Sequence, residues 1–293
     1  MLTDAHCHPA DLALRMSSAE DERRRLAVAC AASATTLAEF EFCERLSREA
    51  ACAGTAPLLP CFAAHPQLPR YRAGGRRGEA VDLAECIDTL ETLAGENRLA
   101  AVGETGFDLY GAAFRETEKE QDFLFAAHLE TALRNGLPLV IHARRSMHKI
   151  FARAAALKKC RAVIFHSWPG TMVEGESLLR RGINAFFSFG AIVALNHREA
   201  MRCCALFPAN RLLAETDAPY QPLRGKGFSS HADLPIIMEA IAALRRKAGS
   251  EGASATCLEK IVERNFHAAF GAERAASGIG AVIGAGSAAG SIT

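Results

Sequence analysis

The chain has 293 residues, 49% of them hydrophobic, which is enough for one large core of the size typical of a (β/α)8 barrel. Its 34 basic and 33 acidic residues leave a formal net charge of +1. Proteins that coat a nucleic-acid backbone carry a large basic excess. That class is therefore excluded, and any nucleic-acid contact is expected to be confined to a cleft.

The ten cysteines and the N-terminal segment indicate the cellular compartment. The cysteines show no paired CxxC spacing, which argues against a zinc ribbon or a disulfide framework and is typical of reduced thiols. Neither a secretory signal nor a long apolar run is found, so the sequence predicts a cytoplasmic or nuclear protein without membrane contact. Residues 273–293, rich in Gly, Ala and Ser, are expected to form a flexible tail behind a single domain of residues 1–272.

Short apolar runs rich in β-forming residues recur along the chain, each followed by a segment of helical pattern. The expected strands, in chain order, are Leu2–His8, Leu26–Ser33, Leu58–His65, Ala100–Asp108, Pro138–Arg144, Ala162–Trp168, Asn184–Ile192 and Leu212–Tyr220.

The clearest helix is expected to begin at Thr117, where Glu120 completes a capping-box pattern. Gly136 suits its left-handed C-cap. The positions that follow helical spacing, and are therefore expected to face the core, are Phe123, Ala126, Leu129, Ala132 and Leu133. A last helix over residues 256–270 is expected to close the fold.

Strict alternation of strands and helices predicts an α/β fold of the closed parallel type, a (β/α)8 TIM barrel forming a single domain. An open doubly wound sheet is the alternative. The GxGxxG fingerprint that would favour a dinucleotide-binding sheet is absent after the first strand.

Polar side chains gather where the expected strands end, and such barrels carry their chemistry at that end. Residues i and i+2 of a strand share a face, so His6 and His8 can chelate a metal together. The same spacing pairs Glu104 with Asp108. The other polar residues at expected strand ends are His142, Arg144, His166, Glu215 and Asp217.

A single histidine in a strand is more often a core or surface group, and His128, His148, His197 and His267 are interpreted in that way. The combination at the strand ends is different. Burying several histidines and carboxylates together costs several kcal/mol per uncompensated charge, so the cluster indicates bound cations.

These segments resemble, in order, the signature segments of the TatD family of metal-dependent deoxyribonucleases, over about residues 2–271. The resemblance implies that His6, His8 and Asp217 bind one divalent metal ion, that His142 and His166 bind a second, and that Glu104 bridges the two. The segments that carry it are Asp4–His8, Gly103–Asp108, His142–Arg144, His166 and Glu215–Tyr220, with Ala64–Pro66, Arg224–Lys226 and Asn265–Phe266.

The chain departs from the family pattern in loops expected to meet substrate. Ser-Trp-Pro-Gly follows His166 where the family usually has Cys-Phe-Ser-Gly, and Arg145 stands where an Asp is common. Phe228–Ser230 replaces the usual Asn-Glu-Pro. The expected ligands are unchanged, so metal binding is expected to persist while substrate preference differs.

The resemblance implies hydrolysis of phosphodiester bonds in DNA by two divalent cations, either Mg²⁺, Mn²⁺ or Zn²⁺. Asp217 is the candidate to accept the proton of the attacking water, with Glu104 and Glu215 as further catalytic carboxylates. Glu215 faces the same way as Asp217, and the resemblance implies that it supports the metal ligands. The expected substrate is a single strand or a 3′ end held in a local cleft by a monomeric exonuclease. DNA repair and DNA fragmentation are the processes that the family suggests.

Several side chains are candidate substrate contacts. Arg144 has a planar fork suited to phosphate oxygens. Trp168 is expected either to stack on a base or to pack in the core. The remaining candidates are His65, Asp108, Arg224 and Lys226, and for the last two a solvated loop charge is the alternative.

Two other functions stay open from the residues alone. A barrel metallohydrolase of esters or amides would share the His-x-His pair, and deacylation of mischarged tRNA is one such reaction. A carboxylated Lys at the end of the fourth strand would favour that class, but Glu104 stands there. A non-catalytic scaffold would be expected to lack ligands that are present here.

Overall fold

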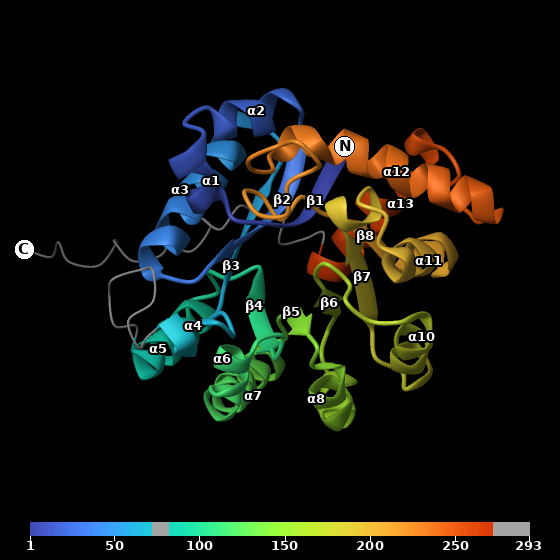
Figure 1. Cartoon of the computed structure of the whole chain (residues 1–293). Helices are drawn as coiled ribbons and strands as arrows, with labels where there is room; N and C mark the ends of the chain where they lie inside the picture. Colours follow the sequence, from blue (N-terminus) through green and yellow to red (C-terminus); the bar gives the residue numbers. More distant parts are fainter. Residues whose placement is uncertain (72–81, 272–293) are drawn as a thin grey trace, which may run out of the picture.

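A ring of eight parallel strands forms the centre of the protein, in a computed structural model that describes residues 1–71 and 82–271 (Figure 1). The strands follow one another round the sheet in chain order. They are β1 (Leu2–Cys7), β2 (Val28–Ala34), β3 (Leu58–Phe62), β4 (Ala101–Asp108), β5 (Leu139–Arg144), β6 (Val163–Phe165), β7 (Ala185–Phe189) and β8 (Leu212–Ala214). The predicted (β/α)8 barrel is confirmed. The predicted tail, residues 273–293, lies outside the described residues.

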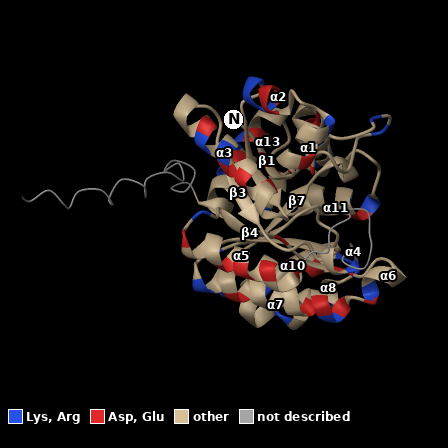
Figure 2. Ribbon diagram, turned by 90° about the vertical axis from the view of Figure 1, so that its left-hand side faces the viewer, with Lys and Arg blue, Asp and Glu red and all other residues tan. Residues whose placement is uncertain are grey.

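Helices connect successive strands and surround the ring (Figure 1). They are α1 (Pro9–Arg15), α2 (Ala19–Arg25), α3 (Leu37–Ala53), α4 (Leu68–Tyr71), α5 (Leu83–Gly95), α6 (Ala112–Arg115), α7 (Glu118–Arg134), α8 (Met147–Ala152), α9 (Ala154–Leu157), α10 (Met172–Arg180), α11 (Arg198–Leu206), α12 (Leu234–Ala248) and α13 (Ala255–Phe270), with 3₁₀ turns η1 (Ala191–Val193), η2 (Ala209–Arg211) and η3 (His231–Asp233). Acidic and basic residues are interspersed on these helices (Figure 2). None of the described helices is long and apolar enough to span a membrane.

Helix α13 covers the amino-terminal end of the ring. Its Phe266 joins one buried cluster with strand residues such as Val140, Ile164 and Leu213. Asn265 donates hydrogen bonds to the carbonyl oxygens of Ala209 (2.7 Å) and Leu212 (2.8 Å), at the start of β8. Because this end is closed, the carboxyl ends of the strands are left as the accessible mouth.

The ring nearly closes between β8 and β1 through the segments that carry candidate ligands. The Asp217 amide donates to the His6 carbonyl oxygen (2.9 Å), and the His8 amide donates to that of Ala218 (2.7 Å). Asp4 accepts hydrogen bonds from both the backbone amide and the hydroxyl of Thr216. Folding of the seam therefore also fixes the positions of His6, His8 and Asp217.

Irregular register in two strands lies beside the mouth. The pairing shifts in β1 between Asp4 and Cys7, and in β4 between Val102 and Thr105. Such bulges re-aim side chains, so the simple alternation expected from the sequence does not hold there. The segments concerned include His6 and Glu104.

Glycine is required where β4 meets β5. Gly106 lies opposite His142 with φ of +136°, and a Cβ on it would clash with the His142 backbone carbonyl. Only glycine tolerates both the positive φ and this approach. Gly106 thereby allows the chain that carries Glu104 to lie against the chain that carries His142.

Helix α7 follows the sequence expectations only in part. Thr117 is its N-cap residue, but the side chain makes no capping hydrogen bond: its hydroxyl donates to the Phe114 carbonyl oxygen (3.0 Å) and accepts from Gln121 (3.2 Å). Leu129 and Ala132 are buried as expected, but Phe123 and Ala126 are exposed, because the buried stripe continues through Leu124, Phe125 and His128. Gly136 does take the predicted left-handed conformation, with φ of +58°.

Candidate active site and metal centre

Polar side chains at the carboxyl ends of the strands line a cavity of about 1080 Å³. His6 lies just below its surface and is fully buried. Several predicted strand ends prove to be loops, since β6 stops at Phe165 and β8 at Ala214. The predicted metal ligands nevertheless converge here: His6, His8, Glu104, His142, His166 and Asp217.

The two oxygens of Glu104 face two different groups of imidazoles. Oε2 lies 3.2 Å from His6 Nε2 and 3.7 Å from His8 Nε2. Oε1 lies 2.7 Å from His142 Nδ1 and 3.0 Å from His166 Nε2. Glu104 is therefore the common member of both groups.

Asp217 completes the first group. Its Oδ1 lies 3.6 Å from His6 Nε2 and 3.4 Å from His8 Nε2, and those two nitrogens are 3.1 Å apart. Its Oδ2 accepts a hydrogen bond from Gln221 Nε2 (2.7 Å). Asp217 has a φ of +53°, just where the chain turns away from β8.

His65 belongs to the second group, although the sequence marked it only as a substrate contact. Its Nε2 lies 3.2 Å from Glu104 Oε1, and His65, Glu104 and His142 offer ligand atoms within 4.8 Å of one another. The one sequence feature that could have indicated this role for His65 was its position just beyond β3. Spacing alone could not show that the loop turns His65 towards Glu104.

The donor set fits divalent cations. Burial alone would raise the pKa of Glu104, but the imidazoles of His166, His65 and His6 hold that pKa well below its usual range. The pKa of Asp217 is also lowered, since the hydrogen bond from His8 and the nearby imidazoles outweigh burial. Two ionised, nearly buried carboxylates among imidazole nitrogens form a mixed N and O set that suits Zn²⁺ or Mn²⁺ and admits Mg²⁺.

A surrounding layer of hydrogen bonds, with one ion-pair contact from Glu215 to His166, orients the imidazoles. Ser33 Oγ lies 3.2 Å from His6 Nδ1, and Asp108 Oδ2 lies 3.3 Å from His142 Nε2. Glu215 Oε1 lies 3.4 Å from His166 Nδ1 and accepts from the Ser167 amide (2.7 Å). Partners of this kind fix ring orientation and tautomer.

Glu215 has the supporting position expected for it, whereas the catalytic role also predicted for Glu215 and the substrate contact predicted for Asp108 need correction. Both side chains are fully buried and neither lines the cavity, so neither reaches a substrate. Asp108 also accepts from Gln67 Nε2 (2.7 Å), and its contacts with His142 and Gln67 lower its pKa to about 2 despite burial. The structure places both carboxylates as supports for histidines.

Trp168 lies in the core, so base stacking, one of its two predicted roles, is excluded. It is 1% exposed and packs edge-on against Phe165 (5.3 Å between ring centroids) and Phe187 (4.7 Å). Ser167, with φ of +42°, turns the chain inward just before it. The position of Trp168 two residues after His166 in the sequence could not reveal that turn.

The predicted cationic contacts differ in their placement. Arg144 lines the cavity and is 48% exposed. Arg224 is exposed but lies outside the cavity lining, and Lys226 forms an ion pair with Asp233. Arg224 and Lys226 therefore do not contact a ligand in the cavity as the structure stands.

His231 is a buried residue that sequence reasoning missed. Its Nδ1 lies 3.2 Å from Asp4 Oδ2, and Cys7 lies close to both. Burial opposes protonation, but Asp4 raises the pKa of His231. The pair ties η3 to the β1–β8 seam under the metal centre, and a histidine more than two hundred residues from Asp4 gave no local signal.

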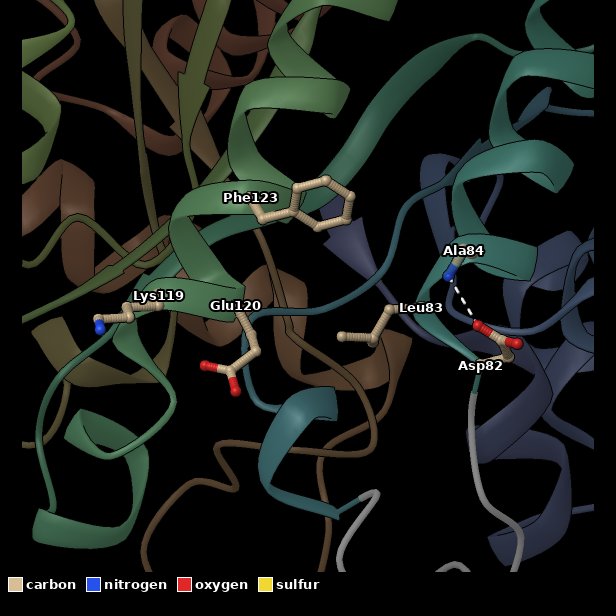
Figure 3. Close-up of a pocket in the computed structure, with 6 residues that line it drawn as sticks. All are labelled: Asp82, Leu83, Ala84, Lys119, Glu120 and Phe123. Carbon is tan, nitrogen blue, oxygen red and sulfur yellow. Dashed lines mark hydrogen bonds between the residues drawn. The ribbon is translucent and has the colours of Figure 1, made fainter.

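A second hollow of about 410 Å³ lies outside the ring, between the amino-terminal ends of α5 and α7 (Figure 3). Phe123 and Leu83 face each other across it, while Lys119 points away (Figure 3). None of the candidate site residues lines it.

Comparison with known proteins agrees with this geometry. The profile of the family described as TatD related DNase matches residues 3–271. The chain belongs to this family. This TatD-related protein is therefore an enzyme of the metal-dependent hydrolase class.

Curated relatives carry matching names. A 3′-5′ ssDNA/RNA exonuclease TatD of Erwinia tasmaniensis is 31% identical over 202 residues, covering 66% of this chain and 77% of that protein. An uncharacterized metal-dependent hydrolase TatD of Mycobacterium tuberculosis is 32% identical over 176 residues, covering 57% of this chain and 65% of that protein.

Solved structures share the fold of this TatD-related chain. The Escherichia coli TatD homolog YJJV superposes with a TM-score of 0.74 at 22% identity, covering 92% of this chain and 97% of that one. An uncharacterized amidohydrolase from Saccharomyces cerevisiae gives a TM-score of 0.68 at 15% identity, covering 90% and 98%.

Proposed function

We propose that this protein hydrolyses phosphodiester bonds of single-stranded nucleic acid, most simply as a DNA exonuclease, with two divalent cations. The observation that carries the proposal is the placement of Glu104, whose two carboxylate oxygens face two separate groups of imidazoles. A carboxylate between two ligand groups can hold two cations side by side, as two-cation hydrolysis needs.

The ligands divide between the two ions. His6, His8 and Asp217 would hold one, His142 and His166 would hold the other, and Glu104 would contact both. His65 joins the second group through its contact with Glu104. When bound, such a pair of cations neutralises the phosphate oxygens, lowers the pKa of bound water and stabilises the leaving oxygen.

The protein's own groups supply proton transfer and orientation. Asp217 lines the cavity as an ionised carboxylate, so it can accept the proton of the attacking water. Gln221 holds its Oδ2, and Glu215 and Asp108 hold the rings of His166 and His142. Arg144, at the cavity wall, is placed to bind a phosphate oxygen.

Nucleic acid is the substrate class that the mouth and the relatives favour together. The Erwinia tasmaniensis relative is named an exonuclease of ssDNA and RNA. The chain's own cavity has Arg15, Arg144 and Arg145 in its wall, whereas the chain as a whole is nearly neutral. This matches a short strand bound in a local cleft.

The test is release of nucleotides from end-labelled single- and double-stranded DNA with Mg²⁺, Mn²⁺, Zn²⁺ or EDTA. We expect metal-dependent degradation that EDTA and the His142→Ala substitution both abolish. Lys119→Ala, on α7 and outside the cavity lining, is the control. Intact DNA with every metal, from a protein that binds metal, would refute the nuclease. Ester and amide substrates, mischarged tRNA included, would then be assayed.

A further inference from the structure

Tyr110 forms an aromatic platform at the edge of the cavity. The residue is 51% exposed and lines the cavity, two residues beyond the end of β4. Its backbone is held in place: its amide donates to Asp108 Oδ1 (3.0 Å), and the neighbouring Leu109 amide donates to the Arg144 carbonyl oxygen (2.8 Å). An exposed aromatic ring on a fixed backbone is a pre-organised surface for a planar ligand.

Two arginines gather at this ring. The guanidinium carbon of Arg144 lies 4.2 Å from the Tyr110 ring centroid, and that of Arg145 lies 4.7 Å from it. Arg145 has a φ of +54°, a turn that brings two consecutive arginines to the same ring. Both guanidinium groups lie over the ring in cation–π contact, so a base that stacks on Tyr110 takes the place of one of them, which can then turn to the phosphate.

The positive charge at this edge is poorly compensated. Arg144 has one carboxylate partner among the described residues, the fully buried Asp108, at 3.7 Å. No carboxylate in the described ranges forms an ion pair with Arg145. Both arginines line the cavity, so an anion there would meet two guanidinium forks.

A single side chain, that of Asp108, lies between Arg144 of this platform and the candidate metal ligands. Arg144 approaches Asp108 Oδ2 (3.7 Å), Asp108 approaches His142 Nε2 (3.3 Å), and His142 Nδ1 contacts Glu104 (2.7 Å). A phosphate at Arg144 would therefore lie beside the place where cations held by Glu104 would bind the scissile phosphate, and not in that place. That is the relation of neighbouring nucleotides in a strand.

We propose that Tyr110, Arg144 and Arg145 form a subsite for the nucleotide next to the scissile bond, with the base on Tyr110 and the phosphate on the arginines. The subsite rests on the proposed function and specifies its substrate. A base inside a duplex has both faces covered by its neighbours, so stacking on Tyr110 requires an unpaired nucleotide or a strand end. Stacking on an aromatic ring tolerates any base, so the subsite selects single strands without selecting sequence.

The experiment compares a short labelled oligothymidylate with the same oligonucleotide carrying abasic residues at its ends. Hydrolysis with Mn²⁺ is measured for wild type, Tyr110→Ala, Tyr110→Phe and Arg145→Ala. Phe123→Ala, an exposed aromatic on α7 outside the cavity lining, is the control. Binding is measured in parallel by fluorescence anisotropy in EDTA, which separates binding from hydrolysis.

Tyr110→Ala is expected to lower kcat/KM on the normal strand on the order of 10- to 100-fold and to have little effect on the abasic strand. Tyr110→Phe should retain the wild-type value because the ring remains. Arg145→Ala should weaken binding of the strand. It should also reduce the salt dependence of the binding constant by the amount expected for about one phosphate contact.

Equal losses on the two strands, or wild-type cleavage of the normal strand by Tyr110→Ala, would overturn the subsite while leaving the nuclease in place. Absence of hydrolysis in wild type, with binding that Tyr110→Ala weakens, would instead refute the nuclease and support the subsite. Absence of both hydrolysis and binding in wild type would overturn both proposals.

Discussion

Gln221 connects the cavity wall to the candidate proton acceptor. Its side-chain amide donates to Asp217 Oδ2 (2.7 Å) and to Ser167 Oγ (3.0 Å), and Gln221 and Ser167 both line the cavity. One carboxylate oxygen of Asp217 is thereby fixed while the other faces His6 and His8. The orientation of Asp217 thus depends on a neutral donor from the loop that follows β8.

Removing this donor should impair the metal site. Gln221→Leu is expected to lower metal affinity or hydrolysis about 10- to 100-fold, the usual effect of losing a partner that orients a ligand. The measurement is the Mn²⁺ concentration for half-maximal activity, together with kcat. Ser167→Ala leaves the bond to Asp217 intact and should have a smaller effect. Unchanged metal affinity and kcat in Gln221→Leu would contradict this role.

His128 is a buried histidine that must stay neutral. Its Nε2 accepts a hydrogen bond from the Ala64 amide (3.3 Å), and its Nδ1 lies 2.5 Å from Thr105 Oγ1. Burial lowers the pKa of His128 to about 3 from 6.5. Between these values the proton binds only in the unfolded state, so stability is lost as the pH falls below 6.5.

The expected loss from His128 is about 2 kcal/mol of unfolding free energy on going from pH 8 to pH 5. Urea unfolding of wild type and His128→Gln at both pH values measures it. The variant has no titrating group at this position, so its pH-dependent loss should be smaller by that amount. The same pH dependence in the two proteins would contradict the neutral, buried assignment.

At the scale of elements, α2 is joined to the amino-terminal ends of two strands by one buried arginine. Arg23 is 1% exposed, and its Nη1 donates to the carbonyl oxygens of Val28 and Ala56, each at 2.7 Å. Its other nitrogens pair with Glu20 at 2.7 and 2.8 Å. The guanidinium group therefore donates hydrogen bonds to two backbone carbonyl oxygens, one at the start of β2 and one just before β3.

Arg23→Leu is expected to lower the free energy of unfolding by about 3 kcal/mol, because two buried carbonyl groups lose their donor and Glu20 keeps only Arg24. Arg25→Ala, an exposed arginine of the same helix, should change it by less than about 0.5 kcal/mol. Urea unfolding of both variants provides the comparison. Equal stability of Arg23→Leu and wild type would show that the contacts contribute little.

Sequence patterns predicted the elements well because apolar runs and their alternation with helices follow from burial. They also predicted which residues gather at the mouth, since every strand of a parallel barrel ends there. What they missed depends on loops beyond the strands. His65, Gln221 and His231 act through turns set by distant hydrogen bonds, and Trp168 turns into the core after Ser167.

At the scale of the whole molecule, ionisable groups lie close together at the mouth of the barrel, and cations bound among them should stabilise the folded protein. Glu104 and Asp217 lie among imidazoles at 2% and 6% exposure. A ligand present at a hundred times its Kd stabilises a protein by about 2.7 kcal/mol per site, if it binds only the folded state. Metal binding should therefore be visible as thermal stability of the entire barrel.

We expect each bound Mn²⁺ ion to raise Tm by about 5–10 °C relative to EDTA, since each kcal/mol shifts Tm by about 2–4 °C in a domain of this size class. Scanning calorimetry measures the shift, and His142→Ala should show a smaller one. Equal Tm values in Mn²⁺ and EDTA would indicate that the cluster does not hold a metal ion in the folded protein.

We propose above all that Glu104 joins two cation sites that together perform hydrolysis. The most direct measurement is metal stoichiometry by mass spectrometry of Mn²⁺-equilibrated protein, with DNA hydrolysis followed on the same samples. Wild type should bind two ions per chain and degrade DNA, consistent with a two-ion site. His142→Ala should retain one ion and Glu104→Gln should lose binding at both sites, and both variants should be inactive. A single ion in active wild-type protein, or full activity in Glu104→Gln, would contradict the account.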